Sequence, residues 1–155
     1  MRRSDREVTD LASIHAIVDA CLVCRVGLAV DGEPYVVPVS FGFDGESVYF
    51  HTALDGRKID MMAANPRVCV QFERGVELVT DPEDACAWTF HYESVIGFGS
   101  VVELIDEPDK SRGLNQIMKH YSGRDWVLDP ARLASTRVWR VDLDELTGKR
   151  SEAKG

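Results

Sequence analysis

The sequence predicts a mainly β protein, in which five or six antiparallel strands and a few short helices form a closed or partly closed barrel. Two Asp-Gly pairs, at positions 31–32 and 44–45, each separate two strand-like runs, which is typical of tight hairpin turns. A third run, residues 87–105, keeps a two-residue alternation over a long stretch, as a long strand does. The helical patterns between these runs are short.

The length and composition are those of one ordinary globular domain, which we expect to span residues 1–155. The 155 residues are 45% hydrophobic and 28% charged. No apolar run approaches the roughly 20 residues of a membrane span, and the opening M-R-R-S-D-R-E lacks the apolar core of a signal peptide. We therefore expect a cytoplasmic protein that does not bind a membrane. A net charge of −8 also argues against nucleic acid as a partner.

The first half of the chain reads as one helix followed by a meander. Ser4-x-x-Glu7 matches a capping box, and apolar residues follow at three- and four-residue steps as far as Cys21, which predicts a helix. Strands are expected at residues 21–30, 35–43 and 47–53. Because tight turns separate them, they predict a three-stranded antiparallel meander.

The second half alternates short helices with strands. A helix of about ten residues is expected after Gly56, ending at Asn65-Pro66 because proline disfavours helical geometry in the residue before it. A strand at residues 67–74 and an acidic, turn-rich connection at 75–86 lead into the long strand at 87–105. A third helix is expected from residue 106 to Ser122-Gly123, and a last strand at residues 136–143.

Arg57 and Lys58 stand in the first turn of the predicted second helix. Cations are unfavourable at this end of a helix dipole, by roughly 0.3–1 kcal/mol per charge. A bound phosphate would resolve the conflict, because free backbone N–H groups and both side chains would converge on one anion. The other interpretation is a solvated pair that tolerates a small penalty, and the local sequence leaves both open.

Two further places favour ligand contacts. Ser94 interrupts the apolar even-numbered face of the long strand, where its hydroxyl would either bond the backbone of a bend near Gly97 or face a polar ligand. His51 and Thr52 end a strand just before the Arg57-Lys58 helix, although a carbonyl-bonded histidine and simple strand propensity also account for them. Pro38 lies within a strand and predicts an edge, a bulge or a planar neighbour there.

The four cysteines do not form a convincing metal site. If residues 21–30 are a strand, Cys21 and Cys24 point to opposite faces and cannot share a zinc ion. Buried structural cysteines are the favoured interpretation, so no metal site is expected. The motifs of serine hydrolases, nucleoside-triphosphate binding, zinc proteases and dinucleotide-binding loops are also absent from the sequence.

An ordered set of segments resembles the FMN-binding split-barrel family that is related to pyridoxamine 5′-phosphate oxidase. The segments are V-P-V-S-F, Y-F-H-T-A, G-R-K-I-D-M-M-A-A-N-P-R-V, Y-x-S-V-I-G-F-G and W-R-V-D-L-D-E-L-T-G-K. Together they cover roughly residues 3 to 150. Within the family, the likeness is to the nitroimidazole-resistance branch, which resembles 5-nitroimidazole reductases.

The resemblance implies a six-stranded antiparallel Greek-key split barrel, a homodimer, and two FMN molecules at the subunit interface. Arg57 and Lys58 resemble the family's phosphate binders, in agreement with the helix argument. The remaining residues that resemble cofactor contacts are Val37, Pro38, Val39, Ser40 and Phe41 against the flavin ring; His51, Thr52 and Ala53 near the ring and ribityl chain; Ser94 and Val95 on the long strand; and Trp139 and Arg140 late in the chain.

The sequence therefore favours a homodimeric flavoprotein that passes electrons from NAD(P)H through FMN to a small acceptor, such as a nitroaromatic. His51 resembles the histidine of the nitroimidazole branch and is the candidate catalytic residue. Pyridoxamine oxidases carry basic residues around a leucine pair where this chain has V-V-P-V-S-F, so vitamin B6 oxidation is not expected. Two alternatives remain: a non-catalytic flavin- or haem-binding protein, with His51 or His91 as the haem ligand, and a structural dimer whose Arg57-Lys58 pair is merely exposed.

Overall fold

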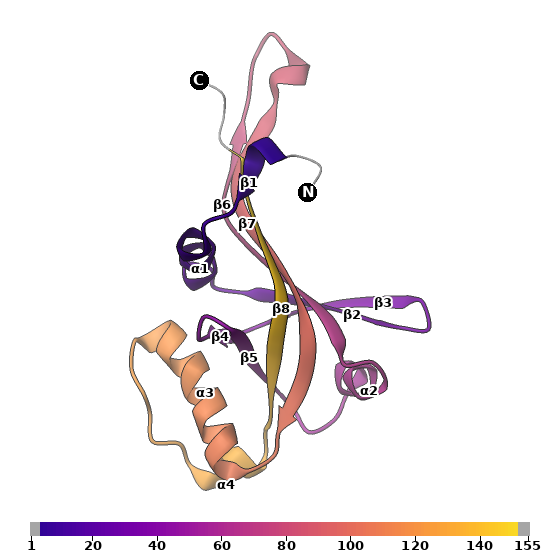
Figure 1. The fold of residues 1–155 in the computed structure, drawn as a ribbon, viewed down its shortest axis with the longest axis vertical. Helices are drawn as coiled ribbons and strands as arrows, with labels where there is room; N and C mark the ends of the chain where they lie inside the picture. Colours follow the sequence, from indigo (N-terminus) through magenta and orange to yellow (C-terminus); the bar gives the residue numbers. More distant parts are fainter. Residues whose placement is uncertain (1–3, 152–155) are drawn as a thin grey trace.

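The computed structural model describes residues 4–151, which fold around a single antiparallel sheet with short helices on its sides (Figure 1). The mainly β fold predicted from the sequence is confirmed. Its elements are η1 (Ser4–Arg6), β1 (Glu7–Val8), α1 (Leu11–Asp19), β2 (Cys24–Val30), β3 (Glu33–Val39), β4 (Phe41–Phe43), β5 (Ser47–Thr52), α2 (Arg57–Ala64), β6 (Arg67–Val79), η2 (Ala85–Ala87), β7 (Thr89–Leu104), α3 (Glu107–Ser122), α4 (Pro130–Ala134) and β8 (Arg137–Ser151).

One bent strand closes the barrel. The order of the sheet is β3-β2-β6-β7-β8-β5-β4, so β3 and β4 lie at opposite ends of it although only Ser40 separates them in sequence. The chain thus leaves β2 as a pairing partner and joins β5. The predicted three-stranded meander is wrong at this point, because the second strand changes partner at Ser40. If β3 and β4 are counted as one strand and the two-residue β1 is set aside, six strands remain of the eight in the sheet.

Both Asp-Gly turns form as predicted. Asp31 (φ 50°) and Gly32 (φ 83°) both have left-handed backbone conformations, the combination that matches the twist of a two-residue hairpin. Asp44 accepts hydrogen bonds at Oδ1 from the backbone N–H groups of Glu46 and Ser47, at 3.0 and 2.8 Å. These contacts fix the turn that leads into β5.

The core lies inside the curled sheet and under α1 and α2. Its largest fully buried side chains are Phe41, Phe50, Phe72, Ile17, Val18, Val26, Val48, Val68, Val70, Val95, Val138 and Val141. Most of them are β-branched or aromatic residues, which suit a strand that buries one face. The Phe41 and Phe72 rings lie 5.0 Å apart, so side-chain packing inside the barrel joins β4 to β6, which are not neighbours in the sheet.

The long strand β7 buries the face opposite to the expected one. Its odd-numbered residues Val95 and Val101 lie in the core, whereas the even-numbered Ile96, Phe98 and Val102 are exposed. The prediction that Ser94 interrupts a buried apolar face is therefore wrong, since Ser94 is half-buried on the outward face. The two-residue alternation separates the two faces of a strand, but it does not show which face packs against the core of the same chain.

Gly99 lies on the buried face of β7, where the backbone of β8 comes close. A Cβ atom at this position would lie 2.3 Å from the backbone oxygen of Asp142. The pairing of β7 with β8 also changes register between Phe98 and Gly99. Glycine at this position therefore permits the close approach of the two backbones.

The N-terminal segment differs from the prediction. Glu7 and Val8 pair with β8, so α1 begins only at Leu11. Asp10 caps it by accepting a 2.9 Å hydrogen bond from the Ser13 backbone N–H. A local cap therefore replaces the expected capping box, because the preceding residues find a partner strand that the sequence pattern does not reveal.

The cysteines before and in β2 are buried. The strand begins at Cys24 and not at residue 21, and the thiol of Cys21 donates to the backbone oxygen of Ile17 at 3.2 Å. Burial raises the pKa of both Cys21 and Cys24, which keeps the thiols protonated. These two are buried, as predicted, whereas Cys69 is half-buried and Cys86 is exposed, so the prediction of buried cysteines is wrong for Cys86. Among residues 4–151, no three His, Cys, Asp or Glu side chains gather where they could hold a metal ion.

Strands β6 and β8 are longer than predicted. β6 continues past an irregularity between Arg74 and Glu77 to Val79, so the segment expected to be a turn-rich connection forms part of a hairpin with β7. We call its outer part, residues 75–91, the arm; it projects beyond the barrel at the top of Figure 1. β8 likewise continues to Ser151, because its second half pairs with β7 along the base of the arm.

Helices α2 and α3 occur where the sequence predicts them. α2 ends at Ala64 before Asn65-Pro66, and α3 ends at Ser122 with Gly123 in a left-handed conformation (φ 72°). Within residues 4–151, no helix is both long and apolar enough to cross a membrane.

Candidate functional site

Helix α2 begins without a side-chain cap. Gly56 precedes it with φ 131°, a conformation that residues with a Cβ rarely adopt, and a Cβ built on it would meet no atom within 4 Å. The first N–H groups of a helix need acceptors and carry partial positive charge. An uncapped helix start beside open space is therefore suited to an anion such as a phosphate.

The guanidinium of Arg57 leans from this helix start onto β3. Its carbon lies 4.6 Å from the centre of the Tyr35 ring, and its Nη2 lies 3.5 Å from Oε1 of Glu33. The side chains of Arg57 and Glu33 are 56% and 72% exposed, and such an exposed pair contributes little, about 0–1 kcal/mol. Arg57 is thus oriented by β3 but only weakly held.

The end of β5 is fastened to β8 by a buried hydrogen bond. Nε1 of Trp139 donates to Oγ1 of Thr52 at 3.0 Å, and this hydroxyl donates to the backbone oxygen of Ala53 at 2.8 Å. Thr52 and Trp139 are both buried, so each polar group has its partner without help from water. The structure thereby brings together two site residues that lie far apart in the sequence.

Arg137 on β8 binds the loop that follows β5. Its Nε and Nη2 donate to the two carboxylate oxygens of Glu103 at 2.7 and 2.5 Å, and its Nη1 donates to the backbone oxygen of Leu54 at 3.3 Å. The bond to Arg137 holds the pKa of Glu103 below its ordinary value. The pair was missed in the sequence, because its members are 34 positions apart and only the pairing of β7 with β8 joins them.

The segment Val37–Phe41 contains the end of the edge strand β3 and the first residue of β4. β3 pairs only with β2, which confirms the edge position predicted from Pro38. The side chains of Val39 and Phe41 are buried, whereas Pro38 and Ser40 are exposed. The unpaired edge of β3 leaves backbone polar groups available for a ligand.

Within one chain, Ser94 and Val95 lie far from His51 and the end of β5. Ser94 is paired with Lys149 on β8, whereas His51 is paired with Val138 near the other end of that strand. At about 3.3 Å per residue, the two positions on β8 are on the order of 35 Å apart. The side chain of Val95 is also fully buried in the core.

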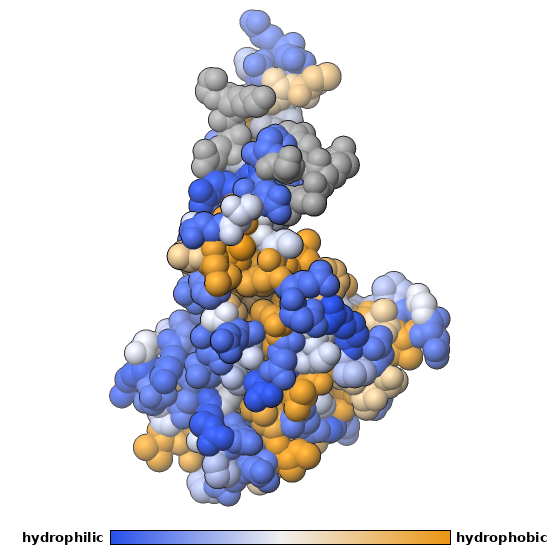
Figure 2. Space-filling model, in the orientation of Figure 1, coloured by the Kyte–Doolittle hydropathy of each residue, from blue (hydrophilic) through white to orange (hydrophobic). Residues whose placement is uncertain are grey.

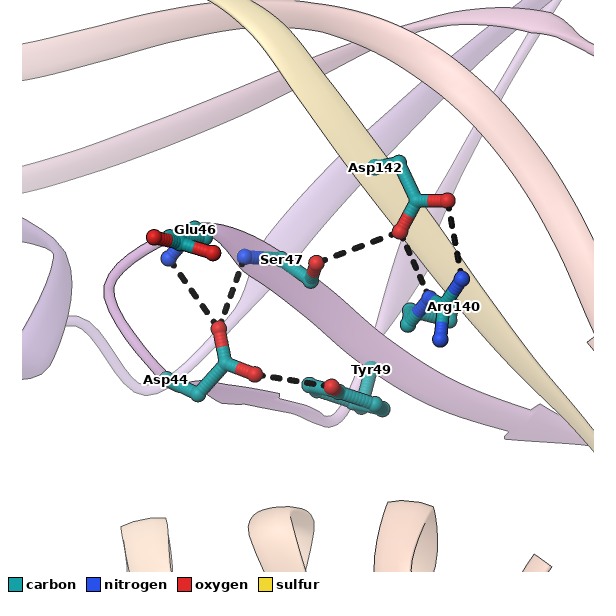
Figure 3. A network of polar contacts seen from close by, with 6 residues as sticks. All are labelled: Asp44, Glu46, Ser47, Tyr49, Arg140 and Asp142. Atoms are coloured by element: carbon teal, nitrogen blue, oxygen red, sulfur yellow. Dashed lines mark hydrogen bonds and ion pairs between the residues drawn. The ribbon is translucent and has the colours of Figure 1, made fainter. Parts of the chain in front are cut away.

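Arg140 lies on β8 beside Asp142 and faces the end of β5 that carries Ser47 and Tyr49 (Figure 3). It donates to both carboxylate oxygens of Asp142, at 2.6 and 3.0 Å, and Oδ1 of Asp142 also accepts from Ser47 at 3.2 Å. The same side carries Tyr49, which donates to Asp44 at 2.7 Å. Arg140 thus lines a separate polar cavity of about 230 Å³ against α3.

His51, Gly56 and Arg57 are exposed to solvent. Another cavity near α3, of about 530 Å³, is lined by the loop around Trp126, and a further one of about 290 Å³ lies between α1 and the turn at Gly45. Neither is lined by the residues at the start of α2 or the end of β5. A ligand at the start of α2 therefore remains exposed to solvent unless another molecule covers it.

The His51 side chain lies on the exposed face of β5, one residue before the buried Thr52 that ends the strand. Its surroundings partly remove the ring from water, which lowers its pKa, and the positive charge of Lys58 lowers it further. Near neutral pH the ring is therefore uncharged and offers one N–H donor and one acceptor nitrogen.

Comparison with known proteins decides the family. Residues 10–150 match the family model described as pyridoxamine 5′-phosphate oxidase, which covers most of the chain. The chain belongs to the pyridoxamine 5′-phosphate oxidase family. An uncharacterised protein of Rhizobium meliloti is 34% identical over 55 residues, so that match spans only 36% of either chain.

Solved structures agree with this family and with the split-barrel fold. A candidate 5-nitroimidazole antibiotic resistance protein from Bacteroides thetaiotaomicron is 32% identical, with a TM-score of 0.82, over 92% of this chain and 85% of its own. An FAD- and haem-binding protein from Mycobacterium smegmatis shares the fold at 20% identity, with a TM-score of 0.83, over 95% of this chain and 74% of its own.

The electrostatics of the site can be tested through His51. Replacing Lys58 with methionine removes the charge and keeps the length of the side chain, so we expect the pKa of His51 to rise part of the way to its ordinary value while burial still holds it down. In the wild type, the pKa of His51 is lower in the folded protein than in the unfolded chain. As the pH falls, the unfolded chain therefore binds a proton at His51 first, and the free energy of unfolding decreases between the two pKa values.

NMR titration of the four histidine rings measures this directly. Lys119→Met, which removes an exposed lysine on α3, is the matched control and should leave His51 unchanged. An identical His51 titration curve in Lys58→Met and wild type would contradict the assigned cause.

Proposed function

We propose that this member of the pyridoxamine 5′-phosphate oxidase family is an FMN-binding oxidoreductase, with residues 1–155 acting as one domain. It would pass electrons from NAD(P)H through FMN to a small acceptor, such as a nitroaromatic. The observation that carries the proposal is the uncapped start of α2, where Gly56 leaves open space and Arg57 and Lys58 supply positive charge.

These groups fit a phosphate ester. Backbone N–H groups of the first helical turn and two side-chain cations form charge-assisted bonds to phosphate oxygens, which are about twice as strong as neutral bonds. The competing contact of Arg57 with Glu33 is long and exposed, so a phosphate can replace it at low cost. Arg57 would turn from the Glu33 carboxylate to the phosphate.

The ring of the flavin would lie along the open edge Val37–Phe41. A planar ring needs flat backbone beside it and polar groups at its rim, and an unpaired strand edge supplies both. His51, Thr52 and Ala53 border the same region, and Trp139 holds Thr52 in place. When bound, FMN supplies two-electron transfer, while the protein binds and orients it.

His51 is the candidate catalytic residue of this arrangement. Because its pKa is lowered, it would meet the flavin or the acceptor as a neutral hydrogen-bonding group. The 32% identity to the candidate nitroimidazole resistance protein supports a nitroaromatic as the acceptor.

A second copy of the chain would complete the site. The outward face of β7 exposes Ile96, Phe98 and Val102, and Figure 2 shows hydrophobic surface across the middle of the molecule, between the arm and the lower helices. Exposed apolar patches of this kind mark protein interfaces. Ser94 and Arg140 lie away from α2 and would contact the flavin only from the second copy.

Haem is the alternative cofactor, and one spectrum separates the two. The FAD- and haem-binding protein from Mycobacterium smegmatis has the same fold and binds both a flavin and haem. Its sequence identity of 20% supports a shared fold but not a shared cofactor. A flavin absorption band in the untreated purified protein supports the proposal. A Soret band without flavin would replace it with haem binding.

The phosphate site predicts the effect of a double variant. Arg57→Ala with Lys58→Ala removes both cations, so we expect the Kd for FMN to rise by about 100-fold or more, as two charge-assisted bonds of about 1.5–3 kcal/mol each are lost. Flavin fluorescence quenching measures the Kd, and urea unfolding checks that the fold persists.

A matched control removes an Arg and a Lys elsewhere. Lys119 pairs with Asp125, and Arg124 stacks on Trp126, both at the far end of α3. Lys119→Ala with Arg124→Ala lowers the net charge equally and should bind FMN as the wild type does. If the Arg57 and Lys58 variant also retains wild-type affinity, the proposed phosphate site is wrong.

The proposed homodimer predicts that a charge on the outward face of β7 dissociates it. Phe98→Asp should sediment as a 17.3 kDa monomer at micromolar concentration and bind FMN more weakly, whereas the wild type sediments at twice that mass. Leu11→Asp places the same charge at another exposed apolar position and should remain dimeric. A monomeric wild type with bound FMN would refute the shared site.

A further inference from the structure

The last turn of α3 packs against the point where the barrel strand changes partner. The β2–β3 ladder ends with Cys24 opposite Val39, and β4 begins at Phe41, opposite Phe50. Continuing the first register by two steps would place Leu22 opposite Phe41. At this pair the two strands have separated, so no direct ladder bond joins them.

A tyrosine hydroxyl bridges this opening. Oη of Tyr121 accepts a hydrogen bond from the Phe41 backbone N–H at 3.1 Å and donates one to the backbone oxygen of Leu22 at 2.8 Å. The hydroxyl thus occupies the place where the next ladder bond would lie. Beside it, Nε2 of His120 lies 2.7 Å from the backbone oxygen of Cys21, and the His120 ring lies 4.3 Å from that of Phe41.

The bridge fixes a peptide plane. The Phe41 N–H and the Ser40 C=O belong to one rigid peptide unit and point in opposite directions. When Tyr121 holds the N–H, it also sets the direction of the Ser40 carbonyl. The Phe41 side chain is already anchored in the core against Phe72, so the hydroxyl adds orientation of the backbone at the strand switch.

We propose that Tyr121 is a positioning residue for the flavin, which acts through the backbone of Ser40 and Phe41. The inference rests on the proposed function, in which the segment Val37–Phe41 lies along the flavin ring. Tyr121 is 43% exposed, so its hydroxyl contributes little to the stability of the core. Its effect is on the geometry of the ring-facing segment.

The test compares two Tyr→Phe variants of the 155-residue chain. Tyr121→Phe removes the bridge, whereas Tyr49→Phe removes a 2.7 Å bond to Asp44 on the side of the sheet that carries Arg140. Fluorescence titration gives the Kd for FMN, visible absorption gives the band of bound FMN, and urea unfolding gives the stability. We expect Tyr121→Phe to raise the Kd about two- to tenfold and to shift the absorption band. Tyr49→Phe should leave both unchanged.

The outcomes separate this inference from the proposed function. If Tyr121→Phe binds FMN with the wild-type Kd and spectrum, the positioning role is wrong and the flavin site stands. A loss of stability without any spectral shift also overturns it, because that marks a purely structural bond. If the wild type takes up no FMN, both proposals fail.

Amide hydrogen exchange tests the bridge without cofactor. The Phe41 amide should exchange slowly in the wild type and faster in Tyr121→Phe. Should the variant fail to fold, the wild-type measurement alone decides, since a Phe41 amide that exchanges as fast as an exposed one overturns the bridge.

Discussion

The barrel depends on a single strand that changes partner at Ser40. Because β3 pairs with β2 and β4 pairs with β5, the two ends of the sheet are joined by the chain and not by a ladder of hydrogen bonds. This geometry leaves one edge of β3 open and brings the end of β5 and the start of α2 beside it. The candidate site is a consequence of that incomplete closure, and Tyr121 bridges the gap from outside.

Local signals in the sequence predict the parts of the site that local chemistry decides. The Asp31-Gly32 turn, the stop of α2 before Asn65-Pro66 and the Gly123 cap each depend on a few neighbouring residues whose backbone preferences are strong. The two cations at the start of α2 belong to the same class. A helix dipole makes them conspicuous before any tertiary contact is known.

Other features could not be read from the sequence because they depend on distant partners. The arm forms because β6 and β7 continue to pair through residues that locally resemble a loop, and the Arg137–Glu103 pair exists only once β8 lies beside β7. The outward apolar face of β7 is the clearest case. The apolar pattern of this face predicts that it is buried. Within one chain it is exposed, so the prediction is correct only if a second copy of the chain covers the face.

The central claim is that the start of α2 holds the phosphate of a flavin. Comparing FMN with riboflavin isolates that phosphate, since the two ligands share the ring and the ribityl chain and differ only in the anion. Fluorescence titration of the wild-type protein should give a Kd for FMN at least about tenfold below that for riboflavin, as even one charge-assisted bond would produce this difference. Equal affinities would show that the anion is not recognised and would contradict the account.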